Sequence, residues 1–250
     1  MCSQNRSYFP RGLKQPEKGH RFAVDSLLLA CLPEPGPGSR VLELGSGCGV
    51  VSLGLVLANP GLDLQVLGLD LDRELTACAR ENAGLLGLEA SCEFRVQDIR
   101  QLREQRQLGP ESFDLVLANP PFRQQGRGRS SPSQKKTRAR QEAQAGLEEF
   151  LHQGCFALKN KGQLGLLYTA LRLDHLLQLL PKYRLTAKSL RLVHGRVDSP
   201  AGLALVLARK NGGPGLEVQP PLFLYTLDRS KNRLTRQARQ FCPFLGHEQG

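Results

Sequence analysis

One four-residue segment, Asn119-Pro120-Pro121-Phe122, combines residue types that could hold a weakly nucleophilic nitrogen for reaction. The exocyclic nitrogen of an adenine or a carboxamide has a delocalised lone pair, so acceptors must hold its N–H groups before the lone pair can turn toward an incoming methyl group. Asn119 offers a side-chain carbonyl, the rigid backbone of Pro120 or Pro121 offers another, and Phe122 offers a ring for an extruded base. We therefore expect these four residues to be catalytic, although Asn-Pro-Pro could also simply end a strand.

A glycine-rich segment, Glu43 to Gly49, follows a short apolar run and opens a helical pattern. Glycines at such a place let the backbone turn sharply and let a ligand approach main-chain N–H groups at the start of a helix. The spacing is ExGxGxG, and because the sixth position counted from Gly45 is Val50, the dinucleotide fingerprint GxGxxG is absent. A carboxylate two residues before the first glycine suits a cationic ligand better than a pyrophosphate.

Two further carboxylates stand at the ends of the next two expected strands. Asp70 is placed to accept both hydroxyls of a ribose, and Asp98 to accept a hydrogen bond from an adenine amine. Asp70 could instead cap the following helix, a role for which Asp72 competes. Together with the glycine segment, these carboxylates favour S-adenosyl-L-methionine as the ligand. The residues expected to bind it are Glu43, Gly45, Ser46, Gly47, Gly49, Asp70, Leu71, Asp98, Ile99 and Asn119.

The elements that must position these residues form an alternating α/β pattern. Strands are expected at 41–44, 65–70, 92–96, 113–118, 163–168, 186–193 and 203–209, and helices at 22–32, 50–58, 73–86, 143–158 and 172–181. The link between the last two strands is too short for a parallel crossover and permits an antiparallel hairpin. The pattern predicts a Rossmann-like, seven-stranded, mostly parallel sheet with its last strand antiparallel and helices on both faces, as in class I methyltransferases.

The net charge of +11 is concentrated in two segments. Residues 123–140 contain seven Arg or Lys residues and residues 229–239 contain five, and neither segment contains an acid, so the remainder is close to neutral. Concentrated basic segments favour a polyanion as partner, most often nucleic acid. The C-terminal run is either a solvated tail or a second RNA contact. The expected RNA-binding residues are Arg123, Arg127, Arg129, Lys135, Lys136, Arg138 and Arg140.

The composition is that of an ordinary globular protein, with 40% hydrophobic and 23% charged residues. No apolar stretch approaches the roughly 18 residues of a membrane span, and the N-terminal residues lead into no apolar segment of the kind found in secretory signals. The seven cysteines are scattered without CxxC spacing, which indicates reduced thiols in a cytoplasmic protein and no metal site. The five histidines share no motif spacing, so we expect none to be catalytic. We expect a monomer.

The combined motifs resemble the bacterial tRNA1(Val) (adenine-37-N6)-methyltransferases, within the larger group of amino-methyltransferases that carry Asn-Pro-Pro before Tyr or Phe. The similar segments cover nearly the whole chain: 19–30, 41–49, 67–70, 79–83, 119–122, 126–133, 139–142 and 146–151. The resemblance implies that 119–122 hold the adenine, that 22–30 closes over the cofactor through Phe22 and Asp25, and that the basic loop contacts tRNA. The chain departs from the family in its more basic loop and in Gln141, where members usually have His.

Three parts of the chain are expected: an N-terminal extension closing over the cofactor site (1–38), a methyltransferase core with the basic loop 123–140 (39–210), and a basic C-terminal extension packed on the core (211–250). The first functional hypothesis is N6-methylation of an adenine in structured RNA, most notably in a tRNA anticodon loop. The alternatives are N5-methylation of a protein glutamine, which uses the same Asn-Pro-Pro acceptors, and non-catalytic RNA binding. Phe122 and the basic loop favour RNA, and the intact cofactor motifs favour catalysis.

Overall fold

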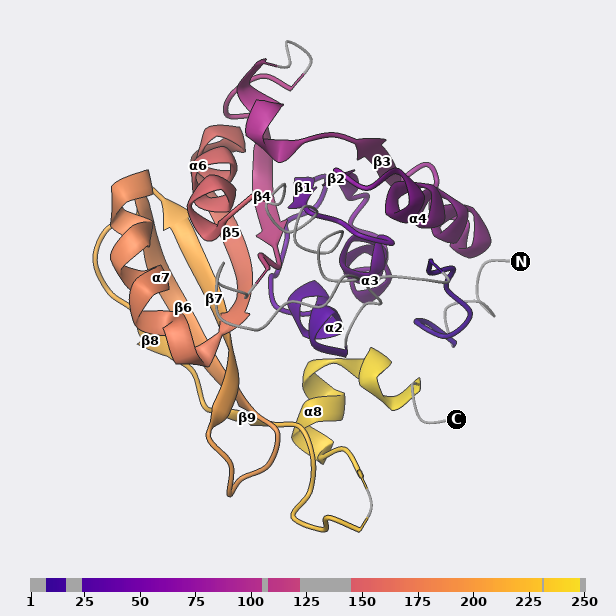
Figure 1. Ribbon diagram of the computed structural model, residues 1–250, viewed down its shortest axis with the longest axis vertical. Helices are drawn as coiled ribbons and strands as arrows, with labels where there is room; N and C mark the ends of the chain where they lie inside the picture. Colours follow the sequence, from indigo (N-terminus) through magenta and orange to yellow (C-terminus); the bar gives the residue numbers. More distant parts are fainter. Residues whose placement is uncertain (1–7, 17–23, 105–107, 122–144, 231, 248–250) are drawn as a thin grey trace, which may run out of the picture.

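A single mixed β-sheet forms the centre of the described part of the protein, and helices lie on both of its faces (Figure 1). The computed structural model describes residues 8–16, 24–104, 108–121, 145–230 and 232–247. The strand order in the sheet is β3-β2-β1-β4-β5-β7-β6-β8, and β9 also pairs with β6. The strands are β1 (Arg40–Leu44), β2 (Gln65–Asp70), β3 (Cys92–Val96), β4 (Phe113–Ala118), β5 (Leu158–Thr169), β6 (Leu185–His194), β7 (Ala201–Lys210), β8 (Glu217–Val218) and β9 (Leu222–Phe223).

The strand directions confirm the expected mostly parallel sheet. Strands β1 to β5 pair with one another in parallel, and β7 is antiparallel to both β5 and β6, as expected for the seventh strand. The expected count of seven strands is wrong, because β8 and β9 add two strands parallel to β6. Each of them is two residues long, which is too short to show an alternating pattern in the sequence. Parallel pairing places the carboxyl ends of β1 to β6 at the same edge of the sheet.

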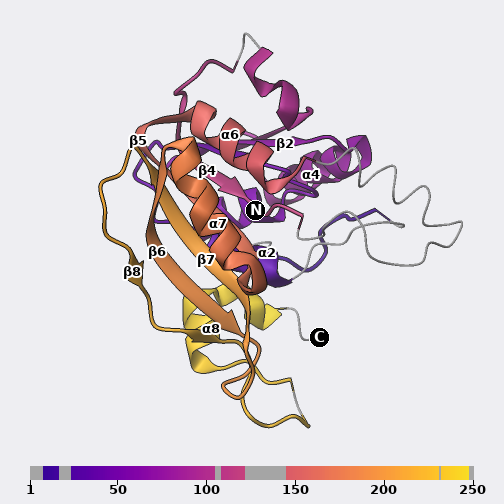
Figure 2. The same ribbon diagram turned by 60° about the vertical axis from the view of Figure 1, so that its left-hand side comes forward.

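Helices cover both faces of the sheet, as expected, because the central strands are apolar on both sides. In β1, Val41 packs into one hydrophobic cluster, whereas Leu42 and Leu44 pack into the other. One face carries α2 (Val24–Ala30), α3 (Val50–Ala58), α4 (Arg73–Leu86) and α8 (Arg236–Phe241), and the other carries η1 (Ile99–Glu104), α6 (Leu147–Ala157) and α7 (Leu173–Leu179). Figure 2 shows α6 and α7 lying over their face. None of the helices in the described ranges is long and apolar enough to cross a membrane.

The second half of the chain departs most from the expected boundaries. The helix expected at 172–181 is divided into η2 (Ala170–Arg172), α7 and η3 (Leu180–Tyr183), and Pro181 lies at the start of η3. Strand β5 begins at Leu158, directly after α6, and is therefore longer than the expected 163–168. Its pairing with β4 shifts register between Phe113 and Leu115. The strand expected from the sequence, 163–168, therefore covers only the later part of β5, where the pairing is regular.

Segments from the two ends of the chain pack together beside α2. The ring of Phe9 meets the ring of Phe244 edge-on at 4.9 Å between centroids. The thiol of Cys242, which follows α8, lies 3.4 Å from the backbone oxygen of Leu27 in α2. Leu245, in η4 (Pro243–His247), is buried in the same cluster. The C-terminal segment therefore rests on α2, the helix that reaches the edge of the sheet described next.

Candidate active site

The loop between β1 and α3 is packed tightly on its inner side and open on its outer side. Gly45, Gly47 and Gly49 have φ values of 73°, 54° and 83°, in the left-handed region that favours glycine. A Cβ atom at Gly49 would lie 2.8 Å from the ring of Phe94, whereas a Cβ atom at Gly47 would meet nothing within 4 Å. The loop thus presents its backbone at Gly47 to any ligand at this edge.

Asp70 orients the same loop from the end of β2. One of its carboxylate oxygens accepts a hydrogen bond from the backbone N–H of Gly47 at 2.8 Å, and the other accepts one from the backbone N–H of Asp72 at 2.8 Å. The cap of α4 is Asp72, whose side chain accepts from the backbone N–H groups of Glu74 and Leu75. This arrangement answers the question left open by the sequence: Asp72 caps the helix, and Asp70 faces the glycine loop.

Glu43 lies beneath the loop, at the end of β1, with 3% of its surface exposed. Its Oε2 atom accepts hydrogen bonds from the backbone N–H of Ser52, at 3.0 Å, and from the Ser52 hydroxyl. Burial raises the pKa of Glu43 to about 8, although the two donors of Ser52 act in the opposite direction. Glu43 therefore links β1 to the first turn of α3 by hydrogen bonds, and these bonds stabilise the turn of the glycine loop between the two elements.

We expect the variant Glu43→Gln to become more stable than the parent as the pH rises. Because the pKa in the folded protein, about 8, lies above the ordinary 4.5, the stabilisation from protonated Glu43 is complete below pH 4.5 and is lost as the pH rises through 8. Gln resembles the protonated form and lacks this dependence. In thermal denaturation from about pH 6 to about pH 9, we expect the Tm of the variant to rise relative to the Tm of the parent as the pH increases. A constant difference over this range would contradict a raised pKa.

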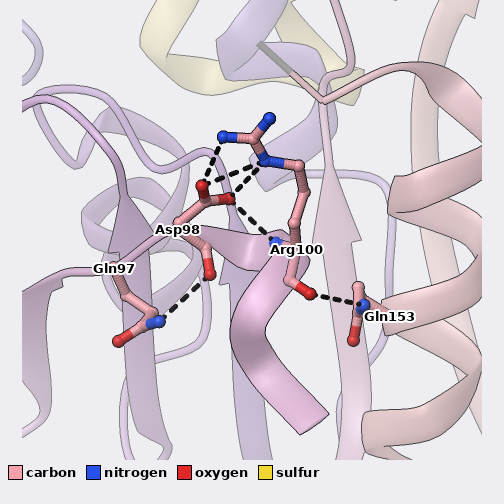
Figure 3. A network of polar contacts seen from close by, with 4 residues as sticks. All are labelled: Gln97, Asp98, Arg100 and Gln153. Carbon is pink, nitrogen blue, oxygen red and sulfur yellow. Dashed lines mark hydrogen bonds and ion pairs between the residues drawn. The ribbon is translucent and has the colours of Figure 1, made fainter. Parts of the chain in front are cut away.

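Asp98, two residues after the end of β3, is bound by a neighbouring arginine (Figure 3). Both carboxylate oxygens contact the Arg100 guanidinium, at 2.9 and 3.0 Å from Nε, and one also accepts from the Arg100 backbone N–H at 3.0 Å. The hydrogen bond to Arg100 lowers the pKa of Asp98 and keeps it ionised. Its neighbour Ile99 is buried in the core. An adenine amine that bonds to Asp98 would share this carboxylate with Arg100.

Asn119 follows β4 and is contacted by a residue from α2. Its amide nitrogen donates a hydrogen bond to the Ser26 hydroxyl at 3.4 Å, which directs the amide oxygen away from α2. Ser26 is 7% exposed and precedes Leu27–Ala30, which are completely buried, so it lies on the side of α2 that packs into the protein. Ser26 was not among the site residues expected from the sequence. The only signal was its position in an apolar helical run, which does not identify a partner 93 residues away.

The two prolines and Asp25 complete the described part of this edge. Pro120 is buried and Pro121 is exposed, so the backbone after Asn119 passes from the core to the surface. Asp25 lies in the first turn of α2, and burial raises its pKa. The other predicted site residues lie outside the described part of the chain. They are Phe22, Phe122, Arg123, Arg127, Arg129, Lys135, Lys136, Arg138 and Arg140.

The sheet brings the described site residues together. Leu44 and Ala118 are paired across β1 and β4, which places the glycine loop beside Asn119. On its other side, the N–H groups of Gly45 and Ser46 donate to the carbonyl of Leu69, so the loop also adjoins Asp70. In the described ranges, no group of three or more His, Cys, Asp or Glu side chains could hold a metal ion.

The edge also fits a cofactor that contains a nucleoside. The hydroxyl of Ser46, in the glycine loop, is buried and has no hydrogen-bond partner among the described residues, which is unfavourable unless a bound molecule supplies one. Leu71 is 47% exposed directly after Asp70, and Val96 is 39% exposed at the end of the next strand. Two exposed apolar side chains beside a carboxylate suit a flat base attached to a ribose.

Comparisons with known proteins agree with this geometry. The family model of the methyltransferase small domain matches residues 23–179, more than half of the chain. A tRNA1(Val) (adenine(37)-N6)-methyltransferase of Porphyromonas gingivalis is 30% identical over 181 residues, which cover 71% of this chain and 67% of that protein. A release factor glutamine methyltransferase of Cereibacter sphaeroides is 34% identical over 102 residues, covering 41% of this chain and 33% of that protein.

A solved structure shares the fold. It is a predicted O-methyltransferase from Agrobacterium tumefaciens, with a TM-score of 0.69 and 21% sequence identity, and the match covers 89% of this chain and 97% of that chain. At this level of identity the similarity concerns the fold alone. It agrees with the expected class I methyltransferase fold.

Proposed function

The chain belongs to the methyltransferase small domain family, and we propose that it methylates the N6 nitrogen of an adenine in structured RNA, specifically in a tRNA anticodon loop. It is a methyltransferase whose cofactor is S-adenosyl-L-methionine. The observation that carries the proposal is the position of Asn119, which adjoins the glycine loop through the pairing of β1 with β4 and is oriented by Ser26. This position supports the proposal that the Asn119 side chain accepts a hydrogen bond from the substrate amine beside the cofactor.

The residues proposed to bind the cofactor surround the glycine loop. Gly47 presents its backbone, Asp70 accepts hydrogen bonds from the ribose, and the Ser46 hydroxyl gains the partner that it lacks. Leu71 packs against the base, and Asp98 with Ile99 lies at its amine edge. Glu43 acts indirectly by holding the loop, and we assign Phe22 and Asp25 to the segment that closes over the ligand.

The reaction needs position and acceptors more than it needs a strong base. When bound, S-adenosyl-L-methionine supplies a methyl group on a positively charged sulfur, which is a good leaving group. The amide oxygen of Asn119 accepts one N–H of the target amine, the backbone carbonyl of Pro120 or Pro121 accepts the other, and Phe122 stacks on the base. The target nitrogen loses its proton readily once it has become positively charged.

Two observations support RNA as the substrate. The Porphyromonas gingivalis protein with 30% identity is named for an adenine of a tRNA. In addition, the seven cations of residues 123–140 directly follow the Asn-Pro-Pro-Phe motif, so the segment suited to phosphates is adjacent to the residues that receive the base. We place the protein in the cytoplasm, where such an RNA is found.

Glutamine methylation is the second candidate, because the Cereibacter sphaeroides protein with 34% identity is named for that reaction. A carboxamide presents the same two N–H groups as an adenine amine, so Asn119 would serve both substrates. The basic residues 123–140 have no evident use on a protein substrate, which favours RNA.

The proposal is tested by following a labelled methyl group from S-adenosyl-L-methionine into bacterial RNA and into bacterial protein from a strain that lacks this gene. We expect label in tRNA, and N6-methyladenosine as the labelled nucleoside after digestion and mass spectrometry. Label in protein, recovered as methylglutamine, would replace the proposal by the second candidate. Absence of label in both fractions, with intact cofactor binding by calorimetry, would favour a non-catalytic RNA-binding protein.

A further inference from the structure

The C-terminal segment forms an ordered projection at the edge of the sheet that carries Asn119. Residues 222–225 continue along the carboxyl end of β6, with hydrogen bonds from the N–H groups of Leu224 and Tyr225 to the carbonyls of His194 and Gly195. The chain then turns back through a bridge between Tyr225 and Leu234. This turn and the β6–β7 loop extend together from the lower end of the molecule in Figures 1 and 2.

Arg196, in the β6–β7 loop, ties these two loops together. Its guanidinium donates to the carbonyls of Thr226 and Asp228 and, at 2.9 Å, to the side-chain oxygen of Asn232. It also lies over the ring of Tyr225, at 5.6 Å from the centroid. Because its donors satisfy backbone carbonyls of the opposite loop, Arg196 orders the turn before any partner binds.

The ordered turn leads to a row of exposed cations. Arg233 follows the tip, and Arg236 and Arg239 are three residues apart in α8, on the side opposite the buried Ala238. None of these three arginines forms an ion pair with a residue in the described ranges. Arg229 adds a further cation that is paired with Asp198 at 2.8 Å.

We propose that Arg233, Arg236 and Arg239 bind the phosphate backbone of the RNA substrate, as a second, preordered contact surface separate from residues 123–140. The proposal rests on the proposed function. Parallel pairing places the β6 carboxyl end at the same edge of the sheet as Asn119, three strands away in the strand order. Exposed arginines without an ion pair among the described residues, on a segment that continues from this edge, suit the stem of an RNA whose loop enters the site.

Exposed apolar side chains at the same edge fit an RNA partner as well. Leu171 is 88% exposed just after β5, and Val197 and Leu227 are exposed on the two joined loops. Isolated apolar side chains among arginines can contact sugars and the faces of unstacked bases, whereas phosphates bind the guanidinium groups. The surface therefore presents both cationic and apolar side chains, which suits a folded RNA that exposes phosphates, sugars and unstacked bases.

The test compares the triple variant Arg233→Ser/Arg236→Ser/Arg239→Ser with a control of equal charge. The control, Arg103→Ser/Lys182→Ser/Arg209→Ser, removes three exposed cations from the η1–η3 side and the opposite edge of the sheet. Binding of a fluorescently labelled valine tRNA transcript is measured between about 50 and 200 mM salt. We expect the first variant to bind about tenfold or more weakly at low salt and its log–log salt slope to fall by about two units. The control is expected to retain the parent's slope to within about one unit.

The outcomes separate this surface from the proposed function. If the parent binds no tRNA, the proposed function itself fails. If the parent binds tRNA and both triple variants lose affinity equally, the C-terminal surface is not a specific contact. Cofactor affinity by calorimetry is expected to be unchanged in both variants, and it verifies that they are folded.

The variant Arg196→Lys tests the ordering, because it keeps the charge but loses the planar set of donors. We expect faster amide hydrogen exchange over 225–234 and a several-fold rise in KM for tRNA, with kcat unchanged. Faster exchange with an unchanged KM would show that the preordered turn contributes nothing to RNA binding.

Discussion

Replacing Asn119 with Ala is expected to lower methyl transfer at saturating RNA by at least about a hundredfold, with cofactor and RNA affinities close to those of the parent. The physical reason is that the lost acceptor acts mainly in the transition state, when the lone pair of the target amine turns toward the methyl group. The measurement combines single-turnover methyl transfer with separate equilibrium binding of RNA and cofactor. Equal losses in RNA affinity and turnover would make Asn119 a structural residue.

The variant Ser26→Ala provides a graded control for this experiment. It removes the hydroxyl that receives the Asn119 amide N–H but leaves the acceptor itself in place. We expect a smaller fall in turnover, roughly fivefold, because loss of one hydrogen bond of about 1 kcal/mol frees the amide to rotate. Ser26→Thr keeps a hydroxyl and is expected to recover most of the activity. Full activity in Ser26→Ala would show that Asn119 is oriented without α2.

Replacing Asp70 with Ala is expected to weaken S-adenosyl-L-methionine binding by roughly 2–3 kcal/mol, or about 30- to 150-fold in Kd. Two effects combine in this value. The variant removes the expected acceptor of the ribose hydroxyls, and it also removes the carboxylate that holds the backbone N–H of Gly47 at 2.8 Å. Isothermal titration calorimetry of the cofactor measures the change directly. A Kd within about threefold of the parent value would assign the ribose to another residue.

Asp72→Ala is the matched control for that experiment. Asp72 lies two residues further along and caps α4, with its side chain on the backbone N–H groups of Glu74 and Leu75. Its loss is expected to cost about 1 kcal/mol of folding stability and to leave cofactor affinity near that of the parent. The pair of variants thus separates a carboxylate that faces the ligand from one that caps a helix.

The sequence by itself determined the elements of the core and the edge at which the site lies. Mostly apolar runs such as 113–118 appear as strands with the expected boundaries, because residues buried on both faces of a parallel sheet are predominantly apolar. The polar motifs follow those runs directly, so parallel pairing alone brings Gly45–Gly49, Asp70 and Asn119 to one edge. Concentrated charge in 229–239 was also evident without coordinates, although its use remained open.

Only the tertiary structure decided which side chains meet within this frame. Ser26 reaches Asn119 and Arg196 orders the turn after Tyr225 through contacts between segments far apart in the chain. Glu43 is bonded to Ser52 rather than exposed to a cation, and Asp98 shares its carboxylate with Arg100. The physical reason is that hydrophobic periodicity and turn residues act over a few neighbouring positions, whereas hydrogen-bond partners depend on how whole elements pack against the sheet.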